Sequence, residues 1–229
     1  MVLPRPWLSL YSTAARGFEP PTPGQYLEDE RALVHADNSS VEAGAKAHLL
    51  GARLALTGAV YGIRRTNVPE AQTSGFYRQI GEGTSRGIEA ALHGSLVRGL
   101  GIDAGYAWTR TEITRDVAGF IGRELPNAPR HKANVWVRDR FPEGRLDHLT
   151  LATGVVHVSN RFLASDNGTI APAYTRLDAS VSYELVGPRL TLVAAVQNVT
   201  NVRYVTSGAG GALWAGAPRR VAFQITSSF

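Results

Sequence analysis

Apolar and polar residues alternate with a period of two in several stretches of the chain, which predicts β-strands with one apolar face. Between residues 100 and 108 every second side chain is aliphatic or aromatic, and the positions between carry glycine, aspartate or alanine. Residues 177–185 repeat the pattern, with aspartate, serine and glutamate on the polar face. About ten such segments follow one another. Their approximate ranges are 7–17, 41–50, 53–67, 76–97, 100–115, 130–141, 148–162, 173–186, 189–200 and 219–229.

The connections between these segments alternate between short and long. Tight turns are expected at 50–53, 98–99, 142–145 and 187–188, and longer links near 18–40, 68–75, 116–129, 163–172 and 201–218. Membrane β-barrels have short turns at one end, long loops at the other, and apolar positions that face lipid. The sequence therefore predicts an all-β fold, an antiparallel transmembrane β-barrel domain over residues 1–229.

Aromatic residues near the strand ends are expected to face outward and form the girdles found at both membrane interfaces. They are Tyr11, Tyr106, Trp108, Phe141, Tyr183 and Phe229. The last segment also ends on an aromatic residue at the carboxyl terminus, like the closing strand of a bacterial outer-membrane barrel. We interpret its apolar positions as a signal for the outer-membrane barrel assembly machinery. They are Val221, Phe223, Ile225 and Phe229.

Composition supports a barrel over a helical membrane protein. Hydrophobic residues make up 44% of the chain, and no run approaches the roughly 18 apolar residues that a spanning helix needs. The 24 Lys and Arg residues give a net charge of +5 but are dispersed, so no nucleic-acid partner is expected. The segment Met1–Trp7 lacks the apolar core of a signal peptide. We therefore expect part of a longer product or a truncated reading frame.

The chain offers little for catalysis or metal binding. Its six histidines form no HExxH motif and no i, i+4 pair, and cysteine is absent. No GxSxG sequence occurs, and the glycine-rich segments 81–83 and 208–211 do not join a strand to a helix. Asp116, Asp166 and His35 fall in or near loops, but their spacing demands no catalytic arrangement. We expect no catalytic residue, no metal ligand, no cofactor and no enzyme.

Seven short motifs follow one another in order over nearly the whole chain. They are Arg16–Pro21, Val41–Lys46, Arg65–Asn67, Gly83–Glu89, Leu125–His131, Gln197–Tyr204 and Gly216–Arg219. Each motif alone is weakly specific, but their order and spacing together are highly specific. The chain resembles the C-terminal half of the β-barrel of a TonB-dependent outer-membrane receptor of the ferric-siderophore type.

The resemblance implies a 22-stranded barrel plugged by an N-terminal domain. These residues would supply about ten of its C-terminal strands, without the plug or the segment that contacts TonB. It also implies a location in the outer membrane of a Gram-negative bacterium, in contact with outer-membrane lipid. The whole protein would take up ferric siderophores, with iron as cargo and energy from the TonB system. The chain alone is not expected to transport by that mechanism.

Aromatic and arginine side chains in the long loops are the candidates for ligand binding, because a metal chelate presents apolar and carbonyl-rich surfaces for stacking and hydrogen bonds. These candidates are Phe120, Arg123, Phe162, Tyr174, Tyr204 and Trp214. Charged residues on the inward face are expected to form salt bridges in the lumen or to contact a plug. They are Arg138, Arg176, Asp178 and Glu184.

Several alternatives remain open from the sequence. The cargo could be cobalamin, haem or a glycan, or the chain could be a truncated remnant that does not transport. A third alternative is a small ten-strand barrel, closed by pairing the strand that starts at Ser9 with the strand that ends at Phe229. A fourth is a soluble β-sandwich.

Overall fold

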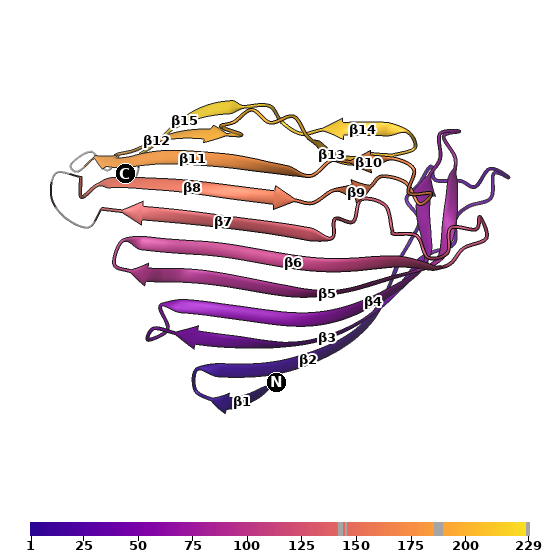
Figure 1. The fold of residues 1–229 in the computed structure, drawn as a ribbon, viewed down its shortest axis with the longest axis horizontal. Helices are drawn as coiled ribbons and strands as arrows, with labels where there is room; N and C mark the ends of the chain where they lie inside the picture. The colour runs from indigo at the N-terminus through magenta and orange to yellow at the C-terminus, as the bar shows by residue number, and fades with distance from the viewer. Residues whose placement is uncertain (142–143, 145, 186–189, 228–229) are drawn as a thin grey trace.

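The computed structural model shows one curved antiparallel sheet of 11 strands that follow one another across the sheet in chain order (Figure 1). The structure describes residues 1–141, 144, 146–185 and 190–227. Within them, no helix has the length and apolar character needed to cross a bilayer. The strands of the sheet are β1 (Val2–Arg5), β2 (Leu8–Glu19), β3 (Ala36–Leu49), β4 (Leu54–Ala71), β5 (Tyr77–Val97), β6 (Leu100–Arg115), β7 (His131–Arg140), β8 (Leu149–Val158), β11 (Tyr174–Leu185), β12 (Leu190–Gln197) and β15 (Arg220–Ser227).

Two short strand pairs lie outside this sheet, within the long connections. The first pair is β9 (Arg161–Phe162) with β10 (Ile170–Ala171), and the second is β13 (Val205–Ala209) with β14 (Ala212–Ala215). All ten strands predicted from the alternation are present in the main sheet. The sequence analysis missed β1, because its four residues contain a proline and are too short to show a period.

The register of the sheet places the apolar positions of successive strands side by side on one face. One continuous row of cross-strand partners runs from β4 to β11, as Leu56, Leu92, Ala104, Val135, Val155 and Leu177. Large apolar side chains on this face remain exposed, including Val60 at 54% and Phe223 at 81%. A soluble sandwich would cover such a face with a second sheet, whereas lipid covers the outside of a membrane barrel. The arrangement contradicts the β-sandwich alternative.

The opposite face is more polar, and large rings on it lie over glycines of the neighbouring strand. Tyr61 is the direct partner of Gly87, and Trp136 is the direct partner of Gly154. A Cβ atom at Gly154 would lie 2.3 Å from the Trp136 ring. Because Gly154 has no side chain, the Trp136 indole can lie across β8 at this position.

Tyr11 belongs to this inward face, so its prediction as an outward girdle residue is wrong. Its hydroxyl donates a 2.7 Å hydrogen bond to Glu42, and a Cβ atom at its partner Gly44 would lie 2.6 Å from the phenol. Tyr106 and Tyr183 lie on the exposed apolar face as predicted, at 45% and 36% exposure. Phe229 lies outside the described residues.

Replacing Gly154 with alanine is expected to lower the free energy of unfolding by about 1–3 kcal/mol, the usual cost of overpacking. The denaturant midpoint of the detergent-solubilised protein measures this change. Gly17→Ala is the matched control, because a Cβ atom there would meet nothing within 4 Å. In the Trp136→Ala background the Gly154→Ala change should cost much less. Equal midpoints for both glycine variants would contradict the proposed packing.

The two ends of the sheet differ as the sequence predicts, with the tight turns at 50–53 and 98–99 at one end and the long connections gathered at the other (Figure 1). The turns predicted at 142–145 and 187–188 fall mostly outside the described residues. The link predicted at 68–75 is shorter in the structure, because β4 continues to Ala71 and pairs with β5 from Val68↔Ile80 to Ala71↔Tyr77, which leaves residues 72–76 as the connection. Asn67 interrupts the ladder with a left-handed φ of 54° and the pairing then resumes. Pro69 and the polar residues around it resemble a turn in sequence, which explains the error.

The sheet is open in the part of the chain that the structure describes. β2 pairs with β1 and β3, and β15 pairs with β12. The strand that contains Ser9 is therefore not joined to the final strand. The alternative of a small self-closed barrel is wrong for this structure.

Candidate functional site

The long connections pack together into a loop cluster, which we define as the β4–β5 hairpin tip with residues 116–130, 159–173 and 198–219. Most of the buried apolar side chains of the described residues lie in this cluster or at the strand ends beside it. They are Leu33, Ala36, Ile80, Ile113, Val158, Leu163 and Ala171, and only Leu54 lies at the opposite end of the sheet. The buried apolar side chains of the described residues are therefore concentrated at the loop end of the sheet.

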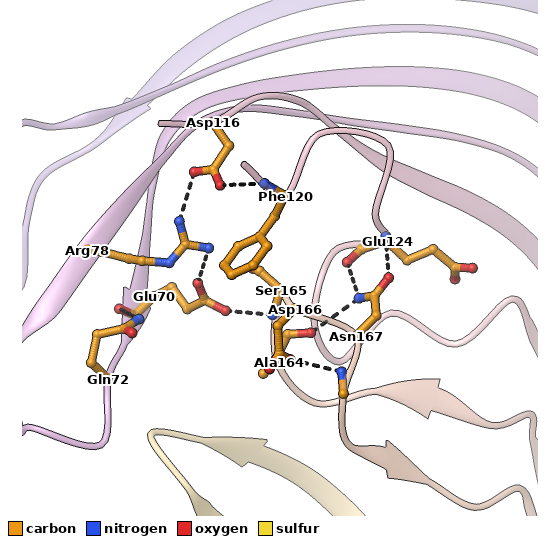
Figure 2. A network of polar contacts seen from close by, with 11 residues as sticks. Glu70, Gln72, Arg78, Asp116, Phe120, Glu124, Ala164, Ser165, Asp166 and Asn167 are labelled. Atoms are coloured by element: carbon orange, nitrogen blue, oxygen red, sulfur yellow. Dashed lines mark hydrogen bonds and ion pairs between the residues drawn. The ribbon is translucent and has the colours of Figure 1, made fainter. Parts of the chain in front are cut away.

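A largely buried arginine, whose side chain is 19% exposed, joins three segments of the loop cluster (Figure 2). Arg78 of the hairpin lies between Glu70, at 2.6 Å, and Asp116, at 2.8 Å. Asp116 also accepts a 3.2 Å hydrogen bond from the backbone N–H of Phe120, and Glu70 accepts one of 2.8 Å from that of Ser165. The side chain of Asp116 has no exposed surface, so this carboxylate depends on Arg78 for its charge balance.

Two asparagines extend the network to the neighbouring loops. The amide of Asn167 accepts a 2.9 Å bond from the N–H of Glu124 and donates a 3.0 Å bond to its carbonyl (Figure 2). Asn127 pairs in the same reciprocal way with the backbone of Gly208, at 2.8 and 2.9 Å. Glu124 also accepts hydrogen bonds from Arg130 and raises the pKa of that guanidinium. Hydrogen bonds from side chains to backbone groups therefore hold the loops of the cluster together, as backbone hydrogen bonds do between strands.

A cavity of about 420 Å³ opens between the hairpin tip, the loops and the β13–β14 hairpin. The ring of Phe120 lines it, with the Arg78 guanidinium 4.9 Å from the ring centroid. Asp166 and the glycine-rich segment 208–211 complete its wall. This volume lies in the range of small-molecule sites, and the lining combines an aromatic face with charged groups and exposed backbone.

Asn198 fixes the other side of the cluster to the sheet. It is 1% exposed, adopts a left-handed φ of 54°, and its N–H donates to buried Asp178 at 2.7 Å. Its side-chain amide donates hydrogen bonds to the carbonyl groups of Val202, at 2.9 Å, and Ala217, at 3.0 Å. The same amide accepts a 2.9 Å hydrogen bond from the N–H of Val202. The motif from Gln197 to Tyr204 therefore acts as a clamp between β11, the start of the loop and its return toward β15.

The six predicted ligand-binding residues all lie in the loop cluster or at the strand end beside it, but they do not form one site. Tyr174 and Tyr204 stack with centroids 4.2 Å apart, and Phe120 lines the cavity. Arg123 donates a 2.7 Å bond to the carbonyl of Asp166, and the Phe162 carbonyl accepts one from Asn127. Trp214, on β14, is 50% exposed.

Sequence reasoning missed Arg78, Glu70 and Asn198. Glu70 and Arg78 are direct cross-strand partners, a complementary pair that becomes visible only when the hairpin is extended beyond Asn67. Asn198 was recognised as part of a family motif, but no pattern in the sequence showed that its side chain is buried.

Three of the four residues predicted to form inward ion pairs do so. Arg176 contacts Asp178 at 2.8 Å. Glu184 contacts Arg140, which the sequence did not single out, at 2.8 Å. Arg138 has no ion pair among the described residues. Among the described residues, no group of three or more His, Cys, Asp or Glu side chains could hold a metal ion. On β15, Val221 and Ile225 lie on the exposed face with Phe223, at 58% and 71% exposure.

A single antiparallel layer that is apolar outside and polar inside, with its loops packed together at one end, is part of the wall of a transmembrane β-barrel. The chain belongs to the TonB-dependent receptor family, because the family model described as TonB dependent receptor-like, beta-barrel matches residues 2–199.

Curated relatives support this assignment. The chain is 29% identical over 229 residues to the metal-pseudopaline receptor CntO of Pseudomonas aeruginosa, covering 98% of this chain and 32% of that protein. It is 30% identical over 226 residues to the ferrichrome outer membrane transporter/phage receptor of Escherichia coli K12, covering 96% and 30%. It is also 30% identical over 207 residues to the ferrioxamine B receptor of Salmonella typhimurium SL1344, covering 88% and 28%. The chain thus spans about a third of the length of these relatives.

Solved structures share the fold. The siderophore receptor PiuA from Acinetobacter baumannii superposes with a TM-score of 0.80 at 22% identity, covering 97% of this chain and 34% of that one. The ferric yersiniabactin uptake receptor FyuA from Yersinia pestis gives 0.81 at 19% identity, covering 99% and 36%. At these identities the likeness concerns the fold alone.

Proposed function

We propose that this chain forms part of the wall and outer loops of an outer-membrane receptor for ferric siderophores. The loop cluster carries the proposal, because it places a cavity of about 420 Å³ and several aromatic side chains at one end of a membrane-type sheet. Membership of the TonB-dependent receptor family supports a receptor that is energised by the TonB system. Uptake belongs to the whole protein, and the chain contributes binding surface and wall rather than catalysis.

The cargo is proposed from the relatives and from the chemistry of the loops. The relatives are named for metal-pseudopaline, ferrichrome and ferrioxamine B, which favours a metal chelate over cobalamin, haem or a glycan. Aromatic faces such as those of Phe120 and Trp214 suit the apolar surface of a chelate, and Arg123 suits its oxygen atoms. The cross-linked loops lower the entropy cost of binding because they are ordered before the ligand arrives.

The other proposed partners are outer-membrane lipid, the barrel assembly machinery and the TonB system. Lipid of the outer membrane covers the exposed row from Leu56 to Leu177. The barrel assembly machinery recognises the closing strand through Val221, Phe223 and Ile225, together with Phe229. The TonB system acts through segments of the whole protein outside these residues.

Trp214→Ala is expected to weaken binding of a ferric siderophore about tenfold, the loss of roughly 1.4 kcal/mol of aromatic contact. Radioiron-loaded ferrichrome, ferrioxamine B and a ferric catecholate are the probes, measured by filter binding to the purified receptor. Trp7→Ala is the matched control, because Trp7 is 49% exposed against 50% for Trp214 but lies at the tight-turn end. Binding of haem or cobalamin in place of every ferric chelate would overturn the proposed cargo. Equal affinities for both variants would overturn the role of Trp214.

A further inference from the structure

The outward face of the sheet carries a cluster of arginines beside the loop end. Arg86 on β5 and Arg110 on β6 are direct cross-strand partners, and Arg64 lies in the next row toward the loops. Arg16 on β2 belongs to the same row as Arg64, because both are partners of Ser39. The four arginines line a hollow of about 840 Å³, which we call the arginine hollow.

Small side chains form the floor of the arginine hollow. Ala14, Val41 and Gly62 are successive partners across β2, β3 and β4 in the row of Arg86. Because these residues are short, the guanidinium groups surround open space instead of packing on larger neighbours. Glu112 is the acidic residue of the lining, so the hollow keeps a positive balance.

The arginine hollow adjoins the apolar band directly. Val60, Ile88 and Trp108 are cross-strand partners in the outward row next to that of Arg86 and Arg110. Val60 and Ile88 are 54% and 51% exposed, as expected for side chains that face lipid tails. Tryptophan is enriched at the boundary between lipid tails and head groups. The arginines therefore lie at the level of the head groups, on the side of the membrane where the long loops project.

The arrangement of Arg86 and Arg110 is unfavourable without an anion. Directly opposed like charges in an antiparallel pair destabilise a sheet. Within the described residues neither guanidinium has a hydrogen bond or ion pair with the protein, whereas Arg64 is paired with Glu82. Both Arg86 and Arg110 are exposed on the lipid-facing side. A bound anion would turn this repulsion into attraction for both residues.

We propose that the arginine hollow binds the phosphate group of a lipid in the surrounding leaflet. Guanidinium groups match phosphate oxygens in geometry and can each donate two hydrogen bonds. The acyl chains of the same lipid would lie along Val60, Ile88 and Trp108, which free phosphate could not use. The inference rests on the membrane placement in the proposed function and is independent of the cargo.

The test measures lipid binding to the delipidated receptor in neutral detergent by native mass spectrometry. The probes are diphosphorylated lipid A and its dephosphorylated form with the same acyl chains, with inorganic phosphate as a competitor. The phosphorylated lipid should bind to the wild-type receptor, and Arg86→Gln should weaken binding about tenfold. The Arg86→Gln/Arg110→Gln double variant should weaken it about 100-fold. Arg138→Gln, on the inward face of β7, should leave it unchanged.

A stability readout separates a lipid site from a purely structural role. In lipid-free detergent, Arg110→Gln should raise or preserve the denaturant midpoint because it removes repulsion with Arg86. With lipid A present, the same variant should have a lower midpoint than the wild type. A loss of stability in both conditions would overturn the proposal.

Three other results of the binding test would also overturn the proposal. One is equal binding of the two lipid forms, and another is displacement of the lipid by an equimolar amount of inorganic phosphate. The third is full affinity in the double variant. Siderophore binding by the double variant should stay unchanged, so this test can fail without affecting the cargo proposal.

Discussion

Replacing Arg78 with methionine is expected to lower the free energy of unfolding by about 3–5 kcal/mol, the usual loss when one partner of a buried ion pair is removed. The reason is the carboxylate of Asp116, which has no exposed surface, and that of Glu70, at 12% exposure. Both would remain buried without a cation. Urea unfolding of the detergent-solubilised receptor measures the change, and limited proteolysis should show cleavage first in residues 116–130.

Two controls separate this effect from a general loss of charge. Arg31→Met breaks an exposed pair with Asp29, whose side chains are 75% and 53% exposed, and should cost at most about 1 kcal/mol. Neutralising the whole network with Arg78→Met, Asp116→Asn and Glu70→Gln should recover much of the lost stability, because no unpaired charge remains. An effect of Arg78→Met no larger than that of Arg31→Met would show that the network does not hold the loops together.

Asn198→Ala is expected to cost a similar amount, about 3–5 kcal/mol. The change removes three side-chain hydrogen bonds and leaves backbone groups of Val202 and Ala217 without their partner. Alanine also tolerates the left-handed φ of 54° less well than asparagine. The denaturant midpoint and the protease sensitivity of residues 198–219 are the measurements.

Asn201→Ala is the matched control for this substitution. Asn201 also has a left-handed φ, 51°, but it is exposed and its side chain accepts one bond, from the N–H of Arg219 at 2.9 Å. It should cost about 1–2 kcal/mol. If the two asparagine variants unfold at the same denaturant concentration, the buried hydrogen bonds of Asn198 do not stabilise the fold more than the exposed one of Asn201.

The strands were predictable because the membrane imposes a simple rule on them. A lipid-facing side chain such as Val155 must be apolar and its neighbour Gly154 faces the lumen, so alternation reports the fold directly. The rule weakened in β2, where polar and small residues occupy both faces and Tyr11 was assigned to the wrong one. It was absent in β1, which has four residues and a proline.

The loop cluster could not be predicted in the same way. Its contacts join residues far apart in sequence, such as Ser165 with Glu70, which are 95 positions apart. No periodicity encodes such a contact, and the residues involved are polar in a chain rich in polar loops. The sequence pointed to Phe120, Tyr174 and Trp214 by residue type, but the cavity and the Arg78 network required the packing of several loops.

The sheet is a membrane wall with its apolar face toward lipid, and spin labels on one strand test this placement directly. The chain contains no cysteine, so single cysteines can carry spin labels at successive positions from Lys132 to Arg138 on β7. After reconstitution of the receptor in lipid bilayers, oxygen accessibility should peak at Ala133, Val135 and Val137. It should be low at the four positions between, which face the lumen. A flat profile, or high access of a water-soluble nickel chelate to Val135, would contradict the account.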